Sequence, residues 1–467
     1  MELAFTLSVY RPRKPKQTPL WKILWENFEK FEQNYNSYYI KQYGFFRPVV
    51  SRVVRKYLEC GDLHKGFARV RCPECHHEYL LAFSCRGRWF CPSCHAKKVV
   101  QFGVHLQANI LYPVPHRQYV FSMPKILRVF FKYNRKLLGK LSQCAQKSLV
   151  TFFQGVLKKN RGIAGSIMAI QTFSDYCRWH PHLHAIVSDG LYTDTGYFYV
   201  MPRRIALQPL KEIFRANVLA MLKKEGLIDD DFIRMIMKWR HTSGFSVHNK
   251  VRIARDDSKG QEALAQYIIR NPFSLKKVHY RQETGKVIYR SKMSHGKNKK
   301  NFQVFPVLDF IAAITQHIPE QSFQLVRYYG WYSNRMRGDR RKRDQEKKAK
   351  VEASAVVEII DITDYRPVRV PSPMWRDCIK KIWEVDPLSC PRCHTEMKII
   401  SFIVQVDVIR KILVHLELWE EFTRRRPPPI HLAAVTAQED DARRRNEPMD
   451  DDGGPGYEEP WVDVHSL

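Results

Sequence analysis

The sequence predicts an α+β protein in which a helical, cysteine-rich module precedes a domain of mixed strands and helices. Apolar and aromatic residues recur every three or four positions over residues 21–39, which is typical of a packed helix face. Two Cys-x2-Cys pairs follow, and from about residue 113 short apolar strands alternate with helical patterns. With 467 residues, 44% of them hydrophobic, the chain can bury the cores of two or three domains.

The expected elements follow one another along the chain. Helical patterns in the first module cover residues 21–39, 48–58 and 99–112. Strand patterns in the mixed domain cover 117–123, 165–171, the stretch that begins at 180, and 244–253, and helical patterns cover 125–157, 208–224, 229–239, 259–270 and 305–317. Asp257 or Ser258 can cap the helix at 259–270, and Pro272 ends it. Two short strands at 276–280 and 286–289 are expected to form a hairpin.

Composition divides the chain into five expected segments. These are a helical and zinc-binding domain (1–112), a mixed domain (113–335), a charged linker (336–365), a small region with a further Cys-x2-Cys pair (366–435) and an acidic tail (436–467). The tail is rich in Asp, Gly and Pro and has too little apolar surface to fold, so we expect it to be disordered.

The charge balance points to a polyanionic partner. Lys and Arg number 78 against 47 Asp and Glu, which gives a net charge of +31. Such an excess repels itself unless a polyanion offsets it, so nucleic acid is the expected partner. An anionic membrane is the alternative, but no apolar run approaches the roughly 18 to 20 residues of a spanning helix. We therefore expect an intracellular, cytoplasmic protein, in which eleven cysteines favour metal sites over disulfides.

The first two Cys-x2-Cys pairs predict a zinc ribbon. Cys72 and Cys75 are separated by 15 residues from Cys91 and Cys94, a spacing typical of four-thiolate zinc sites. Four thiolates leave no open position on the ion, so the expected Zn²⁺ is structural. Four further cysteines are candidates for a second zinc site: Cys60, Cys85, Cys390 and Cys393. Near the late pair in sequence, only Cys378, His394 and His415 could complete a site.

Three histidines alternate at the start of an apolar strand. Since side chains alternate across a strand, His180, His182 and His184 are expected on one face and the apolar residues between and after them on the other. Two imidazoles on one rigid face can hold a divalent metal, while the plainer interpretation is surface or core histidines. Gln171, at the end of the preceding strand, and His180 are both candidates for a third ligand. An open site of this kind suits Mg²⁺ or Mn²⁺ shared with a phosphate.

A tyrosine and an arginine on a later helix could act on that phosphate. Tyr267 and Arg270 are three residues apart and so share a helix face, while Leu264 and Ile268 can pack the helix on the sheet. A metal-bound phosphate and a nearby guanidinium would help a phenol, whose pKa is normally about 10, to act as nucleophile. From the residues alone, a core tyrosine is the better interpretation of Tyr267.

These residues resemble the HUH class of single-strand DNA nucleases, named for a His-hydrophobic-His pair (here His182-Leu183-His184). More narrowly, the chain is similar to rolling-circle insertion-sequence transposases with an N-terminal zinc-binding domain. The matching motifs are Arg71-Cys72-Pro73-Glu74-Cys75, Ala82-Phe83-Ser84-Cys85, Phe90-Cys91-Pro92-Ser93-Cys94, the histidine strand with Ser188-Asp189-Gly190, the residues from Ala265 to Pro272, those from Arg327 to Ser333, and the late cysteine pair. Together they cover residues 45 to 335 and the late pair.

The resemblance implies a mostly antiparallel sheet that bears the histidines, with the tyrosine helix packed against it. It also implies that Tyr267 cuts single-stranded or hairpin DNA at the element's ends, giving a 5′-phosphotyrosine and a free 3′-OH, and that strand transfer into target DNA follows. Some members of the family carry a second tyrosine four residues later, where this chain has Asn271. A homodimer, a water molecule or reuse of Tyr267 would each serve for a second cleavage.

Three other functions remain open at this point. A replication initiator or a relaxase would use the same chemistry, although the zinc domain and the late cysteine pair favour a transposase. A non-catalytic zinc protein that binds nucleic acid would keep every activity without the Tyr267 hydroxyl. A metal hydrolase for small molecules is the third alternative, but it does not explain the net charge of +31.

Overall fold

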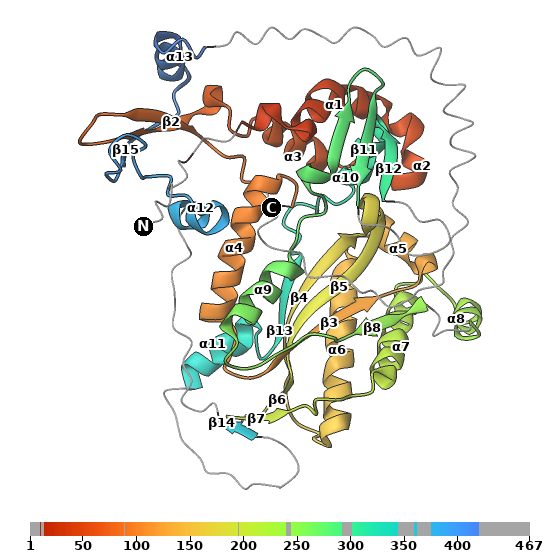
Figure 1. Cartoon of the computed structure of the whole chain (residues 1–467). Coiled ribbons are helices and arrows are strands. Elements are labelled where there is room, and N and C mark those ends of the chain that lie inside the picture. Colours follow the sequence, from red (N-terminus) through yellow and green to blue (C-terminus); the bar gives the residue numbers. More distant parts are fainter. Residues whose placement is uncertain are drawn as a thin grey trace.

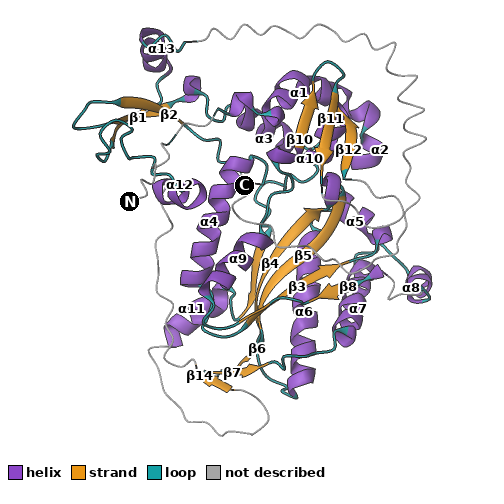
Figure 2. Cartoon of the chain, in the orientation of Figure 1, coloured by secondary structure: helices purple, strands orange, loops and turns teal. Residues whose placement is uncertain are grey.

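The fold was determined as a computed structural model, which describes residues 10, 14–87, 89–194, 196–239, 244–291, 301–343, 359–361 and 375–419. The predicted acidic tail and much of the charged linker lie outside the described residues. The α+β class is confirmed, since helices pack on antiparallel sheets throughout the described chain (Figures 1 and 2). Within the described residues, no helix is long and apolar enough to span a bilayer.

The largest sheet has six strands and carries the histidines. Its order is β13-β4-β5-β3-β8, with β9 also paired to β3, and every pairing is antiparallel. The strands are β3 (His116–Ser122), β4 (Gly165–Phe173), β5 (Trp179–Ser188), β8 (Ser246–His248), β9 (Arg252–Ile253) and β13 (Val326–Gly330). The register places Gln171 on β4 directly opposite His182 on β5. The histidine strand is therefore central, with a neighbour on each side.

Helices cover both faces of this sheet. α6 (Leu137–Leu157) and α7 (Gln208–Lys224) lie on one face, and α4 (Pro92–Asn109) and α9 (Ser258–Ile268) lie on the other (Figure 1). Leu183, Ala185 and Val187 enter the core with α6 and α7, whereas Ile186 enters the core with α4 and α9. The alternation expected for β5 is thus observed, and its histidines share the α9 face.

Several predicted helices have different limits in the structure. The helix expected at 99–112 is α4, which already begins at Pro92, and the helix expected at 259–270 is α9, which ends at Ile268. The helix expected at 125–157 is broken, because the backbone of Asn134 is not helical (φ −118°, ψ 87°), and α5 (Arg128–Tyr133) and α6 are separate. The helix expected at 305–317 starts only at 307, since residues 302–306 form β12 before α10 (Val307–Thr315). The small sheet β14-β7-β6 was not predicted; it consists of β6 (Gly190–Tyr192), β7 (Tyr197–Val200) and β14 (Ile359–Asp361).

A second body of structure combines the N-terminal helices with residues from the middle of the chain. The sheet β10-β11-β12, which contains the predicted hairpin, packs with α10 against the N-terminal helices (Figure 1). Its elements are α1 (Pro19–Tyr38), α2 (Ile40–Tyr43), α3 (Pro48–Leu58), β10 (Val278–Arg281), β11 (Lys286–Arg290) and β12 (Phe302–Pro306). Residues 273–318 of the predicted mixed domain therefore share a core with residues 20–60.

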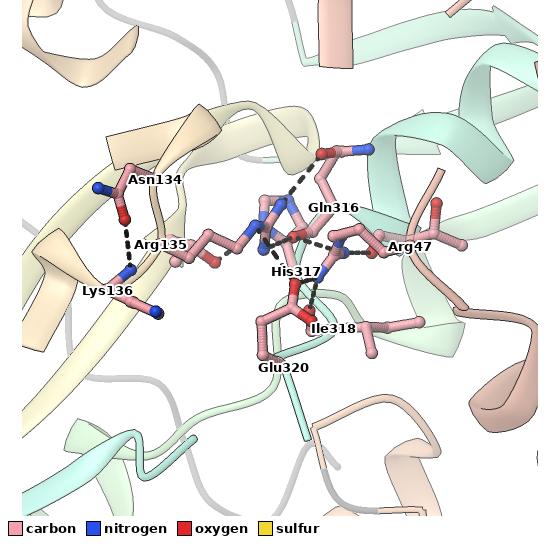
Figure 3. A network of polar contacts seen from close by, with 10 residues as sticks. Arg47, Asn134, Arg135, Lys136, Gln316, His317, Ile318 and Glu320 are labelled. Atoms are coloured by element: carbon pink, nitrogen blue, oxygen red, sulfur yellow. Dashed lines mark hydrogen bonds and ion pairs between the residues drawn. The ribbon is translucent and has the colours of Figure 1, made fainter. Parts of the chain in front are cut away.

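Two arginines bind the C-terminal end of α10, and one of them, Arg135, ties this body to the large sheet (Figure 3). Arg47 donates to the carbonyls of Thr315 (2.8 Å) and Ile318 (2.7 Å), and Arg135 donates to that of Gln316 (2.7 Å). These are carbonyls at the C-terminal end of α10, where backbone acceptors lack helical partners and positive charge is favoured. The Arg135 guanidinium also lies 4.7 Å from the ring centre of Trp179, the first residue of β5. Burial, together with Arg47, lowers the pKa of Arg135 to about 9.

A third sheet brings together two strands that are more than 300 residues apart in the sequence. Strands β1 (Phe67–Arg71) and β2 (Glu78–Ala82) form a hairpin, and β15 (Lys398–Ile403) pairs with β1. α12 (Trp375–Trp383) precedes β15 and packs on α4, and α13 (Val406–His415) follows it.

The Ser-Asp-Gly motif after the histidine strand has a structural role. Asp189 is fully buried, and its Oδ2 accepts from Arg117 at 3.0 Å and from Arg252, while its Oδ1 lies 3.0 Å from Nε of Arg117 in the same ion pair. A Cβ at Gly190 would lie 2.0 Å from the carbonyl oxygen of Tyr199, so only glycine fits there. The motif therefore ties β3, β5 and β9 together.

Replacement of Asp189 by alanine is expected to lower the free energy of unfolding by about 3–5 kcal/mol, because the buried Arg117 and the partly buried Arg252 would lose their counter-ion. Chemical denaturation followed by tryptophan fluorescence measures this. Asp230→Ala is the matched control, since that carboxylate pairs with Lys223 on the surface, where an ion pair contributes little. Equal effects of the two substitutions would contradict the structural role of Asp189.

Candidate functional site

Two imidazoles converge in the buried space between β5 and α9. His182 and His184 are 7% and 3% exposed, and their Nε2 atoms lie 3.1 Å apart. Two ligands at right angles on one ion, each at about 2.1 Å, lie about 3.0 Å apart. The spacing of the pair is therefore that of two neighbouring positions around a small divalent cation.

The second nitrogen of each ring is held by a neighbour. Nδ1–H of His182 donates to the carbonyl of His180 at 2.8 Å, which leaves its Nε2 with a lone pair. Nδ1 of His184 lies 3.3 Å from the side-chain amide group of Gln118 on β3, which is placed with its nitrogen toward the ring. When the oxygen of that amide faces Nδ1–H, the Nε2 of His184 is also an acceptor. Burial, followed by the effects of His182 and Arg270, holds the pKa of His184 well below its usual value, so the ring stays neutral.

Both candidate third ligands lie beside the pair. Gln171 is buried opposite His182, and its amide nitrogen donates to the carbonyl of Ile268 at 2.9 Å. Within the part of the chain that the structure describes, its Oε1 is buried without a hydrogen-bond partner. His180 has its ring centre 5.1 Å from that of His182, and its buried Nε2 also has no partner among the described residues. Gln171 has the better position, since it faces His182 directly.

The structure brings Tyr267 to this pair. Its ring meets that of His184 edge to face, with 5.4 Å between the ring centres. The guanidinium of Arg270 lies over the Tyr267 ring at 5.3 Å and over the Phe173 ring at 5.6 Å. α9 and the residues just after it thus place a phenol and a cation next to two imidazoles.

The position of α9 is set at both ends. Asp257 caps its start by accepting from the backbone of Gly260 at 2.8 Å, as the sequence predicts. At its end, Gln171 binds the carbonyl of Ile268, and Nε2–H of His95 donates to that of Ile269. Burial lowers the pKa of His95 to about 4, so its neutral ring can also accept from the backbone of Trp89.

Sequence reasoning missed several residues of the site. Gln118 is an uncharged polar residue within the predicted strand at 117–123, and that position could have marked it. His95 gives no comparable signal. It directly follows Cys94, so in the sequence it looks like a further metal ligand of the Cys91–Cys94 pair. Asn271 lies just after Arg270, and both its side-chain polar atoms are buried without partners among the described residues.

One group of four cysteine sulfurs lies at the start of α4. Cys60, Cys85, Cys91 and Cys94 are buried, and their sulfur atoms all lie within 4.8 Å of one another. The sulfur of Cys85 lies 3.6 Å from that of Cys94, and the sulfur of Cys60 lies 4.0 Å from that of Cys91. Around a tetrahedral zinc, with Zn–S about 2.3 Å, the sulfurs lie about 3.8 Å apart. The N-terminal end of α4 also favours thiolate charge.

The predicted grouping of the cysteines was therefore wrong. Cys72 and Cys75 do not join Cys91 and Cys94; their sulfurs lie instead with those of the late pair, Cys390 and Cys393. The 15-residue spacing suggested one ribbon, but β1 and β2 carry the first pair away from α4. The expected partners of the late pair, which were nearby in sequence, are replaced by residues more than 300 positions earlier.

The fold and the site define a class of protein with two four-cysteine clusters and, on one face of a large antiparallel sheet, two imidazoles beside a tyrosine. Residues 29–123 match a family model described as a transposase zinc-binding domain, and residues 165–340 match one described as a putative transposase. The transposase for insertion sequence element IS801 of Pseudomonas savastanoi pv. phaseolicola is 25% identical over 76% of this chain and 84% of its own length. The putative transposase y4qJ of Sinorhizobium fredii is 22% identical over 78% of this chain and 91% of its own. No solved structure matches. The chain belongs to the IS91/IS801 family of transposases.

Proposed function

We propose that this transposase cuts and rejoins single-stranded DNA through a covalent 5′-phosphotyrosine on Tyr267. One observation carries the proposal: two imidazole nitrogens 3.1 Å apart lie against the ring of a helix tyrosine. We assign the six-stranded sheet to the HUH type and residues 113–335 to the catalytic domain. The same chemistry would serve a replication initiator or a relaxase, but both relatives are named as transposases.

The residues fit a divalent cation of the Mg²⁺ or Mn²⁺ kind. His182 and His184 supply neutral nitrogens, and the unpartnered oxygen of Gln171 supplies a third donor, with His180 as the alternative. A cation held there would act as a Lewis acid on an oxygen of the scissile phosphate. The carbonyl of His180 fixes Nε2 of His182 as the nitrogen that faces the site, and the Gln118 amide does the same for His184 when its oxygen accepts from Nδ1–H.

Tyr267 and Arg270 supply the remaining chemistry. The phenol oxygen attacks phosphorus, the bond from phosphorus to the 3′ oxygen breaks, and the phenol proton is lost as the 3′ oxygen gains one. The Arg270 guanidinium, held beside the Tyr267 ring, offsets charge on the phosphate. A free 3′-OH can later reverse the step and join a new strand. Because position 271 is asparagine, a second cleavage requires another copy of the chain, water or a reused Tyr267.

The remaining groups support binding rather than bond breaking. We propose a structural Zn²⁺ at the four cysteines of the α4 cluster, where four ligands leave no open position. The net charge of +31 suits DNA phosphates, and we propose single-stranded and hairpin DNA at the element's ends as the substrate. Since the proposed partner is DNA, we propose that the protein acts in the bacterial cytoplasm, at the nucleoid.

A covalent adduct is the expected result when the protein meets single-stranded DNA in Mn²⁺. The protein is incubated with a library of hairpin-containing strands, and complexes that survive denaturant are digested and sequenced. Mass spectrometry of the attached peptide should place the phosphate on Tyr267. Double-stranded DNA of the same sequence serves as the control. Adducts on another residue, or equal adducts with duplex DNA, would contradict the proposal.

A further inference from the structure

We infer that the chain holds a second structural zinc ion, which joins its two distant ends at Cys72, Cys75, Cys390 and Cys393. The sulfurs of Cys72 and Cys393 lie 3.4 Å apart, those of Cys75 and Cys390 3.4 Å, and those of Cys75 and Cys393 3.5 Å. All four lie within 4.8 Å of one another, and none is in a disulfide. Such spacing is close to that of a tetrahedral four-thiolate zinc site, about 3.8 Å between sulfurs.

The two pairs are built alike. Each has the sequence Cys-Pro-x-Cys-His-x-Glu, at residues 72–78 and 390–396. In each, the first cysteine donates its backbone N–H to a carbonyl five residues later, that of His77 (2.8 Å) or Thr395 (2.9 Å). The histidine after each pair has a left-handed backbone, with φ of 56° at His76 and 61° at His394. Two like turns that face each other are the two halves of a zinc ribbon.

The pair at the start of α4 differs at this point. Cys91-Pro92-Ser93-Cys94 is followed by His95 and by a helix, whereas each ribbon half continues through Glu into a strand, β2 or β15. The strands β15, β1 and β2 then form the ribbon sheet, with Phe67 opposite Ile403 and Arg71 opposite Lys398. This difference explains why the two strand-type pairs share one site and the helix-type pair takes Cys60 and Cys85.

The ribbon has too little core to hold together without a metal. Its two apolar clusters contain only four and three buried residues, Val70, Cys72, Cys390 and Met397 in one and Phe67, Ile409 and Leu413 in the other. Sheets of this size need a metal or disulfide for independent stability, and a four-thiolate zinc site supplies it. The ion therefore closes a loop of more than 300 residues, and this loop contains the large sheet.

The zinc site also supports the helix that bears Tyr267, through contacts of α12. α12, just before Cys390, packs on α4, and its Lys381 forms an ion pair with Glu262 on α9. Glu262 in turn accepts from the side chain of Gln266 at 3.0 Å, next to Tyr267. We infer that zinc at the split ribbon keeps α12 in place and so steadies α9. Only this last step rests on the proposed function; the zinc site itself does not.

Metal counting tests the site. Full-length protein is loaded with Co²⁺, whose thiolate charge-transfer bands report cysteine ligation and not the imidazole pair. We expect two thiolate-bound ions per chain, one in Cys393→Ser and two in Cys144→Ser, whose buried cysteine belongs to neither cluster. Cys393 is exposed, so its substitution spares the cores. One ion in the parent protein, or two in Cys393→Ser, would overturn the inference.

A cut chain tests the closure. A protease site is inserted within residues 362–374, and the folded, zinc-loaded protein is cleaved there. We expect the fragment that begins near α12 to stay bound in the parent protein and to be released by a chelator or by Cys393→Ser. Retention after chelation would show that zinc does not hold the ends together. Covalent DNA attachment is assayed separately, so a failed adduct and a failed zinc closure are told apart.

Discussion

Replacement of Tyr267 by phenylalanine is expected to reduce covalent DNA attachment by at least about 1,000-fold, while fold, zinc content and DNA binding stay unchanged. The change removes only the oxygen that would attack phosphorus, and removal of a nucleophile has effects of this size or larger. The ring that packs against His184 and beneath Arg270 is kept, so the helix has no reason to move. Denaturing gels of labelled single-stranded DNA with Mn²⁺ measure the adduct.

Tyr328→Phe is the matched control for this substitution. Like Tyr267, Tyr328 is partly buried and lies beneath an arginine, with the Arg337 guanidinium 5.7 Å from its ring centre. It is on β13, at the edge of the six-stranded sheet, so its hydroxyl should not be needed for cleavage. If Tyr267→Phe retains the adduct, or if both variants lose it, the assignment of the nucleophile is wrong.

Replacement of His184 by alanine is expected to weaken Mn²⁺ binding at least tenfold and to lower cleavage by about 1,000-fold. The substitution removes one of two nitrogens that face the cation site, and the other ligands cannot replace it. Titration of Mn²⁺ followed by electron paramagnetic resonance measures binding without any turnover. His279→Ala is the control, since this exposed histidine lies on β10, in the other body of the protein. Unchanged Mn²⁺ affinity in His184→Ala would remove the metal site.

The same titration decides between the two candidates for the third ligand. Gln171→Leu removes the unpartnered oxygen opposite His182, and His180→Leu removes an unpartnered nitrogen further along β5. We expect the Gln171 variant to bind Mn²⁺ more weakly and the His180 variant to bind it nearly as the parent does. The reverse order would assign the third position to His180.

Much of the histidine site could be predicted because it depends on local rules. Alternation along β5 puts His182 and His184 on one face. The helix pattern around Tyr267 is also local, although α9 ends at Ile268 and Arg270, expected on the same helix face, follows the helix and reaches back over the Tyr267 ring. The N-cap at Asp257 is likewise a local signal. The distance between the phenol and the imidazoles is not local, since it depends on how α9 lies on the sheet, and that is set by backbone acceptors for Gln171 and His95.

The cysteines show where sequence reasoning stopped. Spacing indicates that two thiolates can reach one ion, but a four-ligand site needs two pairs, and any of the three pairs could combine. Which cysteine pairs share a site depends on whether the turn that bears each pair continues as a strand or as a helix. This became visible only in the assembled sheet of β1, β2 and β15.

By itself, then, the sequence determined the α+β class, the histidine face, the tyrosine helix and the presence of cysteine metal sites, because these follow from periodicity and from residue chemistry over a few positions. Only the tertiary structure decided which cysteines share an ion, that residues 273–318 pack with the N-terminal helices, and that α9 lies beside the histidines. Contacts between residues hundreds of positions apart depend on the packing of whole elements, and no local pattern in the chain records that packing.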